Sequence, residues 1–360
     1  MFTYLRLLLF PFSIIYGIVV VVRNKLYDFG IFKSAAFDLP VICVGNLVVG
    51  GSGKTPVTEY LVHLLKDYKI AILSRGYGRK TKGFILANAQ TTAATIGDEP
   101  MQFYHKFPQV TVAVCEDRVY GIQQLKDQHD LIILDDAFQH RAVKPGFSIL
   151  LFEYQKLLCM QFLLPSGNLR EPFSGYKRAE ALLVTKAPDT LSKKEEHYCS
   201  SKFKAAKSEL AFSSLQYGDL ISVFKKESRL IDNLKPGTAI FLLTGIANPK
   251  PLIAYLKQYS TLMVHHEYPD HYQFTTSNIE KLRQAFYTHP ATEKLIITTE
   301  KDAQRLLSSA IQELLLNLPV FYLPVKIDLK ATDKVTFDKK ILDYVSIHTR
   351  NRTIYKAENS

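Results

Sequence analysis

The 360-residue sequence lacks the cysteine patterns of a zinc site or a disulfide framework. Its 4 cysteines are widely spaced and form no CxxC pair, so neither is predicted. There is no dense arginine and lysine block interleaved with aromatic residues, no zinc-finger spacing and no RNP-like segment, which argues against nucleic acid as a partner. No internal repeat, low-complexity tract or coiled-coil heptad is present, so repeat and fibrous folds are excluded.

The composition instead favours a large globular chain with an anionic partner. A length of 360 residues with 47% hydrophobic content supplies enough core for two packed domains. Lysine and arginine outnumber aspartate and glutamate, which gives a net charge of +11. With the nucleic-acid signatures missing, this excess predicts an anionic lipid or a phosphorylated substrate as the partner.

Residues 7–22, "LLLFPFSIIYGIVVVV", form an uncharged apolar run. As a helix the run would reach roughly 24 Å, short of the ~30 Å hydrocarbon core of a bilayer. No small-residue cleavage site follows it, which disfavours a signal peptide. Pro11 and Gly17 are awkward in a regular span and leave a buried core helix open as an alternative. The favoured interpretation is a kinked helix at the membrane interface, because the basic residues that flank the run would attract anionic lipid.

Beyond Asp38, short apolar runs alternate with polar loops and helical stretches. Runs such as "PVICVGN", "DLIILDD" and "ALLVTK" are typical of strands buried on both faces of a parallel sheet. The prediction is an α/β fold with a doubly wound, mainly parallel sheet, a second smaller α/β domain joined by a β-ribbon linker, and an N-terminal membrane-associated helix. The expected boundaries are 1–35 for the helix, 36–207 for the first domain, 208–227 for the ribbon, 228–350 for the second domain and 351–360 for a loose tail.

The segment "VGGSGKTP" follows the first of these strands and opens a helix. In that context glycines let backbone amides converge on a phosphate, and the first domain is therefore predicted to be P-loop NTPase-like. Val48 occupies the first glycine position of the GxxxxGK[ST] pattern, so other glycines must supply the flexibility. Lys54 is expected to reach the outer phosphates and Thr55 to hold Mg²⁺. The predicted phosphate site comprises Gly50, Gly51, Ser52, Gly53, Lys54 and Thr55.

Charged side chains follow other strands at the same expected edge of the sheet. Asp135 and Asp136 end the run "DLIILDD", and at least one of them is expected to bind the metal while the other remains a candidate turn cap. Arg75 and Arg79 in "SRGYGR" and Arg118 in "EDRVYG" are candidates for phosphate contacts, because open α/β sheets bind ligands at the carboxyl ends of their strands. The alternative is that they are solvated surface arginines.

Three further motifs are ambiguous. Asp98 in "GDEPMQF" is either a helix N-cap or a carboxylate aimed at the phosphates. In "HHEYPDHYQF" three histidines gather, but no HExxH-type helix accompanies them, and a zinc site is not predicted. The segment "VTKAPD" departs from the guanine-reading NKxD, so Lys186 and Asp189 are interpreted as ordinary.

Taken in order, eight motifs carry a resemblance to a known family. With "VGNLVVGGSGKTP", "SRGYGR", "GDEP", "LDDAFQH", "LPSGNLREP", "TGIANP", "YPDHYQF" and "TEKDAQRL", the chain resembles the tetraacyldisaccharide 4′-kinases over nearly its whole length. The resemblance implies transfer of the γ-phosphate of ATP, with Mg²⁺, to the 4′-hydroxyl of a tetraacylated glucosamine disaccharide 1-phosphate, the lipid A precursor. It implies the cytoplasmic face of a Gram-negative inner membrane, where a lipid acceptor and anionic lipids both lie.

The resemblance also assigns roles to residues. It implies that Asp98 pairs with His271, and the expected general base for the sugar hydroxyl is Asp98, with His271 orienting it or tuning its pKa across an interdomain cleft. Ala137 stands where the family commonly has glycine. The other residues that the resemblance places in the active site are Lys54, Thr55, Arg118, Asp135, Asp136, Gln139, Arg170 and Glu171.

Two other kinds of protein remain as alternatives. A membrane-associated P-loop switch or partitioning ATPase would act on a protein partner and would lack acceptor-dependent turnover. The partitioning type usually carries a second lysine beside the loop, where this chain has Val49. A soluble nucleotide kinase is the weaker alternative, because it needs no apolar N-terminus.

Overall fold

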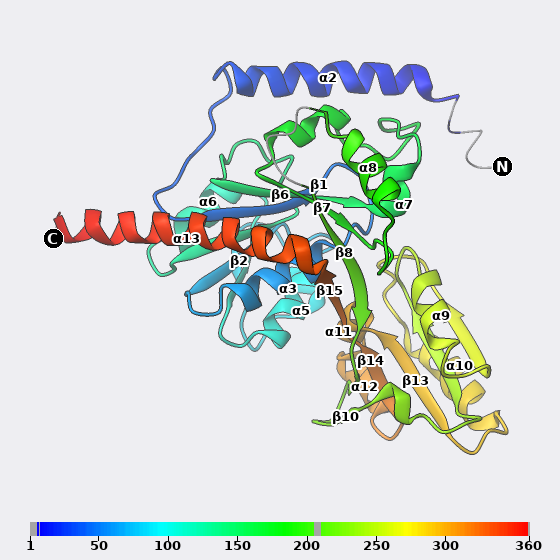
Figure 1. Ribbon diagram of the computed structural model, residues 1–360. Coiled ribbons are helices and arrows are strands. Elements are labelled where there is room, and N and C mark those ends of the chain that lie inside the picture. The colour runs from blue at the N-terminus through cyan, green and yellow to red at the C-terminus, as the bar shows by residue number, and fades with distance from the viewer. Residues whose placement is uncertain (1–5, 7, 205–209, 359–360) are drawn as a thin grey trace.

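The computed structural model contains two α/β units and one outlying helix (Figure 1). It describes residues 6, 8–204 and 210–358. The first unit is built on a nine-stranded sheet and the second on a six-stranded sheet. Helix α2 (Phe10–Asp28) lies apart from both sheets at the top of Figure 1, and α13 (Ala331–Glu358) projects from the first unit.

The nine-stranded sheet has the order β15-β8-β7-β6-β1-β5-β2-β4-β3. All neighbours from β8 to β4 are parallel, and antiparallel strands stand at both edges. This order confirms the predicted doubly wound, mainly parallel sheet. Its strands are β1 (Val41–Asn46), β2 (Ile70–Ser74), β3 (Ile85–Leu86), β4 (Thr111–Val114), β5 (Leu131–Asp135), β6 (Phe147–Glu153), β7 (Ala181–Thr185), β8 (Leu210–Tyr217) and β15 (Val325–Leu329).

Strand β1 illustrates why the central strands are unbroken apolar runs. Val41 and Cys43 point into one apolar core, whereas Ile42 and Val44 point into the core on the opposite face. Because both faces are covered, every residue of β1 is buried. The helices of this unit are α3 (Lys54–Leu64), α4 (Ala93–Ile96), α5 (Asp98–Lys106), α6 (Arg118–Leu125), α7 (Tyr154–Leu158), α8 (Lys193–Ser201) and the 3-10 helix η1 (Phe173–Arg178).

The six-stranded sheet, in the order β10-β9-β14-β13-β11-β12, is the core of the second α/β unit. Strands β11 to β14 are parallel, and β9 and β10 form an antiparallel edge. Its strands are β9 (Leu220–Ser222), β10 (Ser228–Arg229), β11 (Ala239–Thr244), β12 (Met263–Glu267), β13 (Lys294–Thr299) and β14 (Val320–Leu323). Its helices are η2 (Ile231–Asn233), α9 (Lys250–Leu256), α10 (Thr276–Thr288), α11 (Glu300–Leu306) and α12 (Ser309–Leu315).

The ribbon between the units is not formed by the segments that the sequence predicts. The two alternating runs, β8 and β9, do not pair with each other: β8 pairs with β7 and β15, whereas β9 pairs with β10 and β14. The ribbon therefore consists of β8 and β15, the strands that enter and leave the second unit. Alternation along β8 indicated a strand with one solvated face, but it could not identify a partner so distant in sequence.

Helix α13 also departs from the prediction. Phe337, Ile341 and Val345 belong to an apolar core of the first unit, although residues up to 350 were expected in the second. The Tyr344 hydroxyl accepts a hydrogen bond of 3.0 Å from the backbone N–H of Val41. The helix continues to Glu358, so residues 351–358 are helical rather than a loose tail. The domain boundary expected at residue 207 and residues 359–360 of the expected tail lie outside the described residues. The other expected domain boundaries stay a proposal.

Helix α2 exposes its apolar side chains and buries its small ones. Ser13 and Gly17 are its buried residues, which a helix of a soluble core would not show, so that alternative is wrong. Pro11 lies in the first turn, where no N–H is required, and the helix runs unbroken to Asp28 without the expected kink. By length and composition it is the one helix in the described part that could cross a membrane. The exposed apolar residues are Phe10, Phe12, Ile14, Ile15, Ile18, Val19, Val21 and Val22.

Candidate active site

The loop between β1 and α3 has the backbone of a phosphate cradle. Gly50 and Gly53 adopt φ angles of +100° and +84°, which glycine reaches without strain. Gly53 is the N-cap residue of α3, so Lys54 and Thr55 are the first two residues of that helix. The free N–H groups and the positive end of the helix dipole therefore meet at the loop, as an anion requires.

Side chains beneath the loop hold it in place. Asn46 Nδ2 donates to Ser52 Oγ at 2.7 Å, and Thr185 Oγ1 donates to the Ser52 carbonyl at 2.8 Å. Lys186 Nζ donates to the Gly51 carbonyl at 2.6 Å. The interpretation of Lys186 as ordinary is therefore wrong, because its ammonium group supports the backbone of the phosphate loop.

Lys54 connects the loop to the carboxylates at the end of β5. Its Nζ lies 3.5 Å from Asn46 Oδ1 and 3.7 Å from Asp136 Oδ2. Burial alone would raise the pKa of Asp136, but the positive charges of Lys54 and Arg170 hold it below its usual value. Asp136 has a φ of +50°, a left-handed conformation that turns the chain directly after the strand. It is thus a half-buried, ionised carboxylate beside the phosphate loop.

Asp135 has the opposite electrostatic environment. It is 5% exposed, and its Oδ2 accepts a hydrogen bond of 3.2 Å from Ser74 Oγ. Its Oδ1 is buried and has no hydrogen-bond partner among the described residues. Burial, and then the adjacent Asp136 carboxylate, raises the pKa of Asp135 to about 7. A buried carboxylate oxygen without a partner, next to a second carboxylate, fits a divalent cation that prefers oxygen ligands.

A hydrogen-bonded chain leads from Asp136 to a buried glutamate. Arg170 Nη1 donates to Asp136 Oδ1 at 3.0 Å and to Gln139 Oε1 at 3.3 Å. Gln139 Nε2 donates in turn to Glu171 Oε1 at 3.0 Å and to the Asn46 carbonyl at 2.8 Å. The three residues that the resemblance adds at this end of the site therefore contact one another and the end of β5.

Helix α2 docks on this chain through a segment that we call the bridging segment, residues 163–171. Ser13 Oγ donates to the Leu163 carbonyl at 3.0 Å, and Tyr16 Oη donates to the Arg170 carbonyl at 2.7 Å. Asn24 Nδ2 donates to Glu171 Oε2 at 3.2 Å. The polar side chains of Ser13, Tyr16 and Asn24 thus join this helix to the active-site loop.

The opposite side of the bridging segment pairs with the approach to the phosphate loop. The N–H of Val49 donates to the Asn168 carbonyl at 2.8 Å, and the N–H of Arg170 donates to the Leu47 carbonyl at 2.7 Å. The bridging segment therefore lies between α2 and the phosphate loop, and backbone or side-chain hydrogen bonds join it to both.

The three candidate arginines have different environments. Arg118, the first residue of α6, is 3% exposed, and its Nε has no partner within the described chain. Burial, and then the charge of the exposed Arg75, lowers the pKa of Arg118. Two neighbouring cations at the carboxyl edge of the sheet fit an anionic ligand. Arg79 instead bonds Glu116 at 2.6 Å and the Gly83 carbonyl at 2.7 Å, which makes it a structural residue of its loop.

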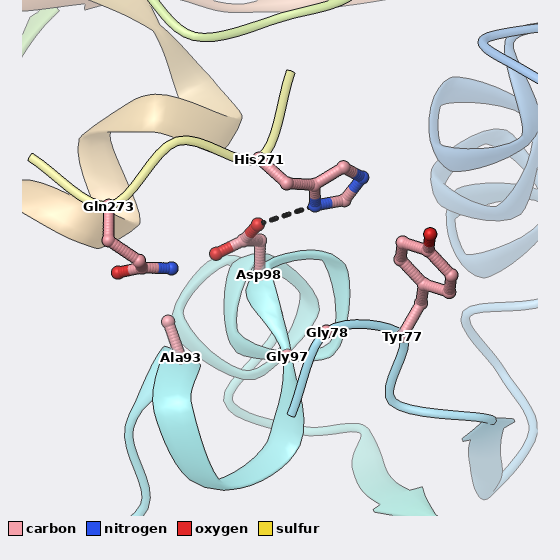
Figure 2. Close-up of a pocket in the computed structure, with 7 residues that line it drawn as sticks. All are labelled: Tyr77, Gly78, Ala93, Gly97, Asp98, His271 and Gln273. Atoms are coloured by element: carbon pink, nitrogen blue, oxygen red, sulfur yellow. Dashed lines mark hydrogen bonds and ion pairs between the residues drawn. The ribbon is translucent and has the colours of Figure 1, made fainter. Parts of the chain in front are cut away.

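Asp98 lies in a separate pocket where the two units meet. Gly97 occupies the N-cap position of α5, so the interpretation of Asp98 as the cap is wrong. Figure 2 shows its carboxylate facing His271, whose Nδ1 lies 3.1 Å from Asp98 Oδ2. Arg305 Nη2 donates to the same oxygen at 2.5 Å. The pocket is lined by Tyr77, Gly78, Ala93, Gly97, Asp98, His271 and Gln273.

Positive charge from the second unit dominates this pocket. Burial alone would raise the pKa of Asp98, but the hydrogen bonds from His271 and Arg305 lower it to about 2. Asp98, Glu99 and His271 have the spacing of a metal-binding group. Lys301 Nζ, however, lies 3.0 Å from His271 Nε2 and 2.9 Å from Glu99 Oε1, so an ammonium group already supplies the positive charge there.

The sequence missed several residues of the site. Asn46 beneath the phosphate loop, and Arg305 and Lys301 beside Asp98, were not singled out, and Lys186 was considered only to be interpreted as ordinary. The signal for Arg305 and Lys301 was available, because both belong to the motif "TEKDAQRL". No signal identified Asn24, which lies just beyond the apolar run of residues 7–22.

Three comparisons relate this chain to known proteins. A family model described as Tetraacyldisaccharide-1-P 4'-kinase matches residues 5–346. A protein named Tetraacyldisaccharide 4'-kinase from Bacteroides thetaiotaomicron is 43% identical over 98% of this chain and 96% of its own length. One of the same name from Flavobacterium psychrophilum is 45% identical over 97% of this chain and 99% of its own. The crystal structure of the "apo" form of LpxK from Aquifex aeolicus in complex with ATP has 30% identity and a TM-score of 0.73, and the match covers 95% of this chain and 99% of that one.

Proposed function

Because the chain belongs to the tetraacyldisaccharide-1-P 4′-kinase family, we infer that it is a lipid kinase of the same activity. It transfers the γ-phosphate of ATP to the 4′-hydroxyl of a tetraacylated glucosamine disaccharide 1-phosphate in lipid A biosynthesis. The observation that carries this conclusion is a family match over residues 5–346, which takes in α2, the phosphate loop and the Asp98 pocket. A P-loop switch or partitioning ATPase that acts on a protein partner is therefore set aside.

The donor phosphates are assigned to the loop Gly50–Thr55. The backbone N–H groups from Gly50 to Gly53 would cradle them, and Lys54 would contact the transferring group. Thr55, Asp135 and Asp136 would hold Mg²⁺, since Asp135 presents a buried oxygen that lacks a partner among the described residues. Bound there, the ion would offset negative charge on the phosphate oxygens. Arg75 and Arg118 are assigned to anionic groups of the nucleotide or acceptor, and Gln139, Arg170 and Glu171 to the orientation of Asp136.

Asp98 is assigned as the general base, with His271 as its partner. The 4′-hydroxyl would give its proton to Asp98 while its oxygen forms a bond to the γ-phosphorus and the bond from that phosphorus to ADP breaks. A carboxylate with a pKa of about 2 is always ionised at neutral pH but is a weak base. That combination fits a loose phosphoryl-transfer step, in which the hydroxyl becomes acidic only as its new bond forms.

Helix α2 is assigned to the cytoplasmic face of the inner membrane. Its exposed apolar side chains would enter the bilayer, and basic residues such as Lys25 and Lys33 would contact anionic lipid headgroups. The double variant Ile15→Glu, Val19→Glu adds two charges to side chains that are 60% and 59% exposed. It should move the protein from the membrane to the soluble fraction, whereas Val335→Glu on α13 should not. Retention of the double variant on membranes would contradict the assignment.

The kinase activity is tested with radiolabelled ATP and the tetraacylated disaccharide 1-phosphate. The expected result is label in the lipid, dependent on both the acceptor and Mg²⁺. ATP hydrolysis that proceeds at the same rate without acceptor, and leaves no label in lipid, would instead support the switch or partitioning ATPase.

A further inference from the structure

The carboxylate of Asp98 is held by two residues of the other unit. Asp98 belongs to α5 of the first unit, whereas His271 follows β12 and Arg305 lies on α11 of the second. Both hydrogen bonds end on the same oxygen, Oδ2, at 3.1 Å from His271 and 2.5 Å from Arg305. In Figure 2 the other carboxylate oxygen points away from His271, toward the side chain of Gln273.

Arg305 is also held by residues of its own unit, Asp302 and Gly245. Its side chain is 0% exposed, and its Nη1 donates to Asp302 Oδ1 at 2.7 Å and to the Gly245 carbonyl at 3.2 Å. Asp302 is held in turn, because its Oδ2 accepts from the Gly245 N–H at 2.9 Å and from Thr299 Oγ1 at 2.8 Å. A planar guanidinium anchored through one nitrogen can present its second nitrogen in only one direction.

The remaining charges around Asp98 do not replace Arg305. Lys301, also on α11, bonds His271 and Glu99 and lies 3.7 Å from Asp270. The helix that carries Asp98 adds Glu99 as a second acidic group, and the loop of Tyr77 contributes a ring that contacts His271 at 5.2 Å between centroids. Among the described residues, Arg305 is thus the arginine or lysine in direct contact with the carboxylate.

We propose that Arg305 is a positioning residue for the kinase reaction: it occupies Oδ2 of Asp98 and turns Oδ1 toward the acceptor hydroxyl. The inference rests on the proposed role of Asp98 as general base. His271 and Arg305 both donate to Oδ2 of Asp98. Oδ1 is therefore the oxygen that can accept a proton from the acceptor hydroxyl. Since Arg305 reaches Asp98 only when the units are in contact, docking of the second unit and orientation of the base are one event.

The test uses Arg305→Gln in the full-length protein, with Glu300→Gln as the matched control. Glu300 is on the same helix and also forms an ion pair between the units, 2.8 Å from Lys106, but does not touch Asp98. For Arg305→Gln, kcat should fall about 10²-fold through misplacement of the base, with little change in KM for ATP. The acidic limb of its kcat–pH profile should move up by about 1 to 3 pH units, because an adjacent positive charge has been removed. Glu300→Gln should leave kcat and the acidic limb unchanged.

Two further variants keep the outcomes distinct. Arg305→Lys retains the positive charge but lacks the planar guanidinium that bonds Asp302 and Asp98 together. Its kcat should therefore fall while the acidic limb of the kcat–pH profile stays in place. If Arg305→Gln does not fold, Arg305→Lys serves as the test variant. Adding Arg305→Gln to Asp98→Asn should cause almost no further loss of kcat. A folded Arg305→Gln with the kcat and pH profile of the wild type, beside an inactive Asp98→Asn, would overturn this inference alone. Full activity in Asp98→Asn would instead overturn the proposed base.

Discussion

Substitution of Asp98 by asparagine should cost both stability and activity. Asparagine keeps the shape of the side chain but removes the charge that faces His271 and Arg305. The ordinary pKa of 3.8 falls to about 2 in the folded protein, and the side chain is 5% exposed, so solvent screens the interaction little. A shift of this size corresponds to about 2 kcal/mol of folding free energy. Arg305 retains Asp302 as a partner, which keeps the cost well below that of a buried charge with no partner at all.

The pH dependence of this cost has a definite sign. The folded pKa of Asp98 lies below its unfolded value, so the ionised carboxylate stabilises the protein fully above about pH 4 and loses this contribution as the pH falls toward 2. The free energies of unfolding of wild type and Asp98→Asn should therefore differ by about 2 kcal/mol at pH 7, and the difference should largely disappear once the pH has fallen to about 2.

Urea denaturation in detergent, followed by circular dichroism, measures the stability, and incorporation of label into lipid measures kcat. At pH 7 kcat should fall about 10²- to 10⁴-fold if Asp98 is the base. Asp270→Asn is the matched control, because Asp270 lies in the same cluster but is 38% exposed. An Asp98→Asn protein with wild-type stability at pH 7 would refute the electrostatic argument, and one with wild-type kcat would remove Asp98 from the chemistry.

Three other substitutions test separate parts of the structure. Lys54→Ala should reduce lipid phosphorylation by about 10²-fold or more in a folded protein, measured as kcat with saturating ATP; near-normal turnover would exclude the loop from the site. Gly17→Leu would place a Cβ 2.7 Å from Leu163 Cδ1 and so push α2 away from the bridging segment. It should lower kcat about 10- to 100-fold, while membrane binding measured by flotation persists. An unchanged kcat would show that the position of α2 does not affect the active site. Burial, and then the Glu300 carboxylate, raises the pKa of Glu59 to about 7, so the folded state loses stability as the pH rises through that value. Glu59→Gln should therefore raise the melting temperature at pH 8 but not at pH 5, and equal shifts at both would contradict this.

The sequence predicted the parts of the site that depend on local geometry. A glycine-rich turn after a buried strand positions Lys54 and Thr55 by itself, and carboxylates at the end of "DLIILDD" must face the same edge of the sheet. The pairing of Asp98 with His271 came from the resemblance, because their separation in sequence gives no physical signal.

The sequence could not predict which side chains far apart along the chain contact each other. Arg305 lies in "TEKDAQRL" and Lys186 in "VTKAPD", but neither motif shows which groups these cations contact. Only the fold brings Asp98 beside Arg305 and the Gly51 carbonyl beside Lys186. The same reason explains the errors at β15 and α13, which return to the first unit. Periodicity reports which face of an element is buried but not which unit buries it.

The return of α13 to the first unit sets the order in which the chain can fold as it leaves the ribosome. The side chains of Phe337, Ile341 and Val345 complete a core that begins at Ile42, and Tyr344 bonds Val41 across 303 residues of sequence. The second unit, whose strands lie between Leu220 and Leu323, can close while synthesis continues. The nucleotide-binding unit must wait, with one apolar face uncovered, until α13 has been synthesised. We therefore expect nascent chains to depend on chaperones or the membrane surface during that interval, and chains truncated before α13 to aggregate.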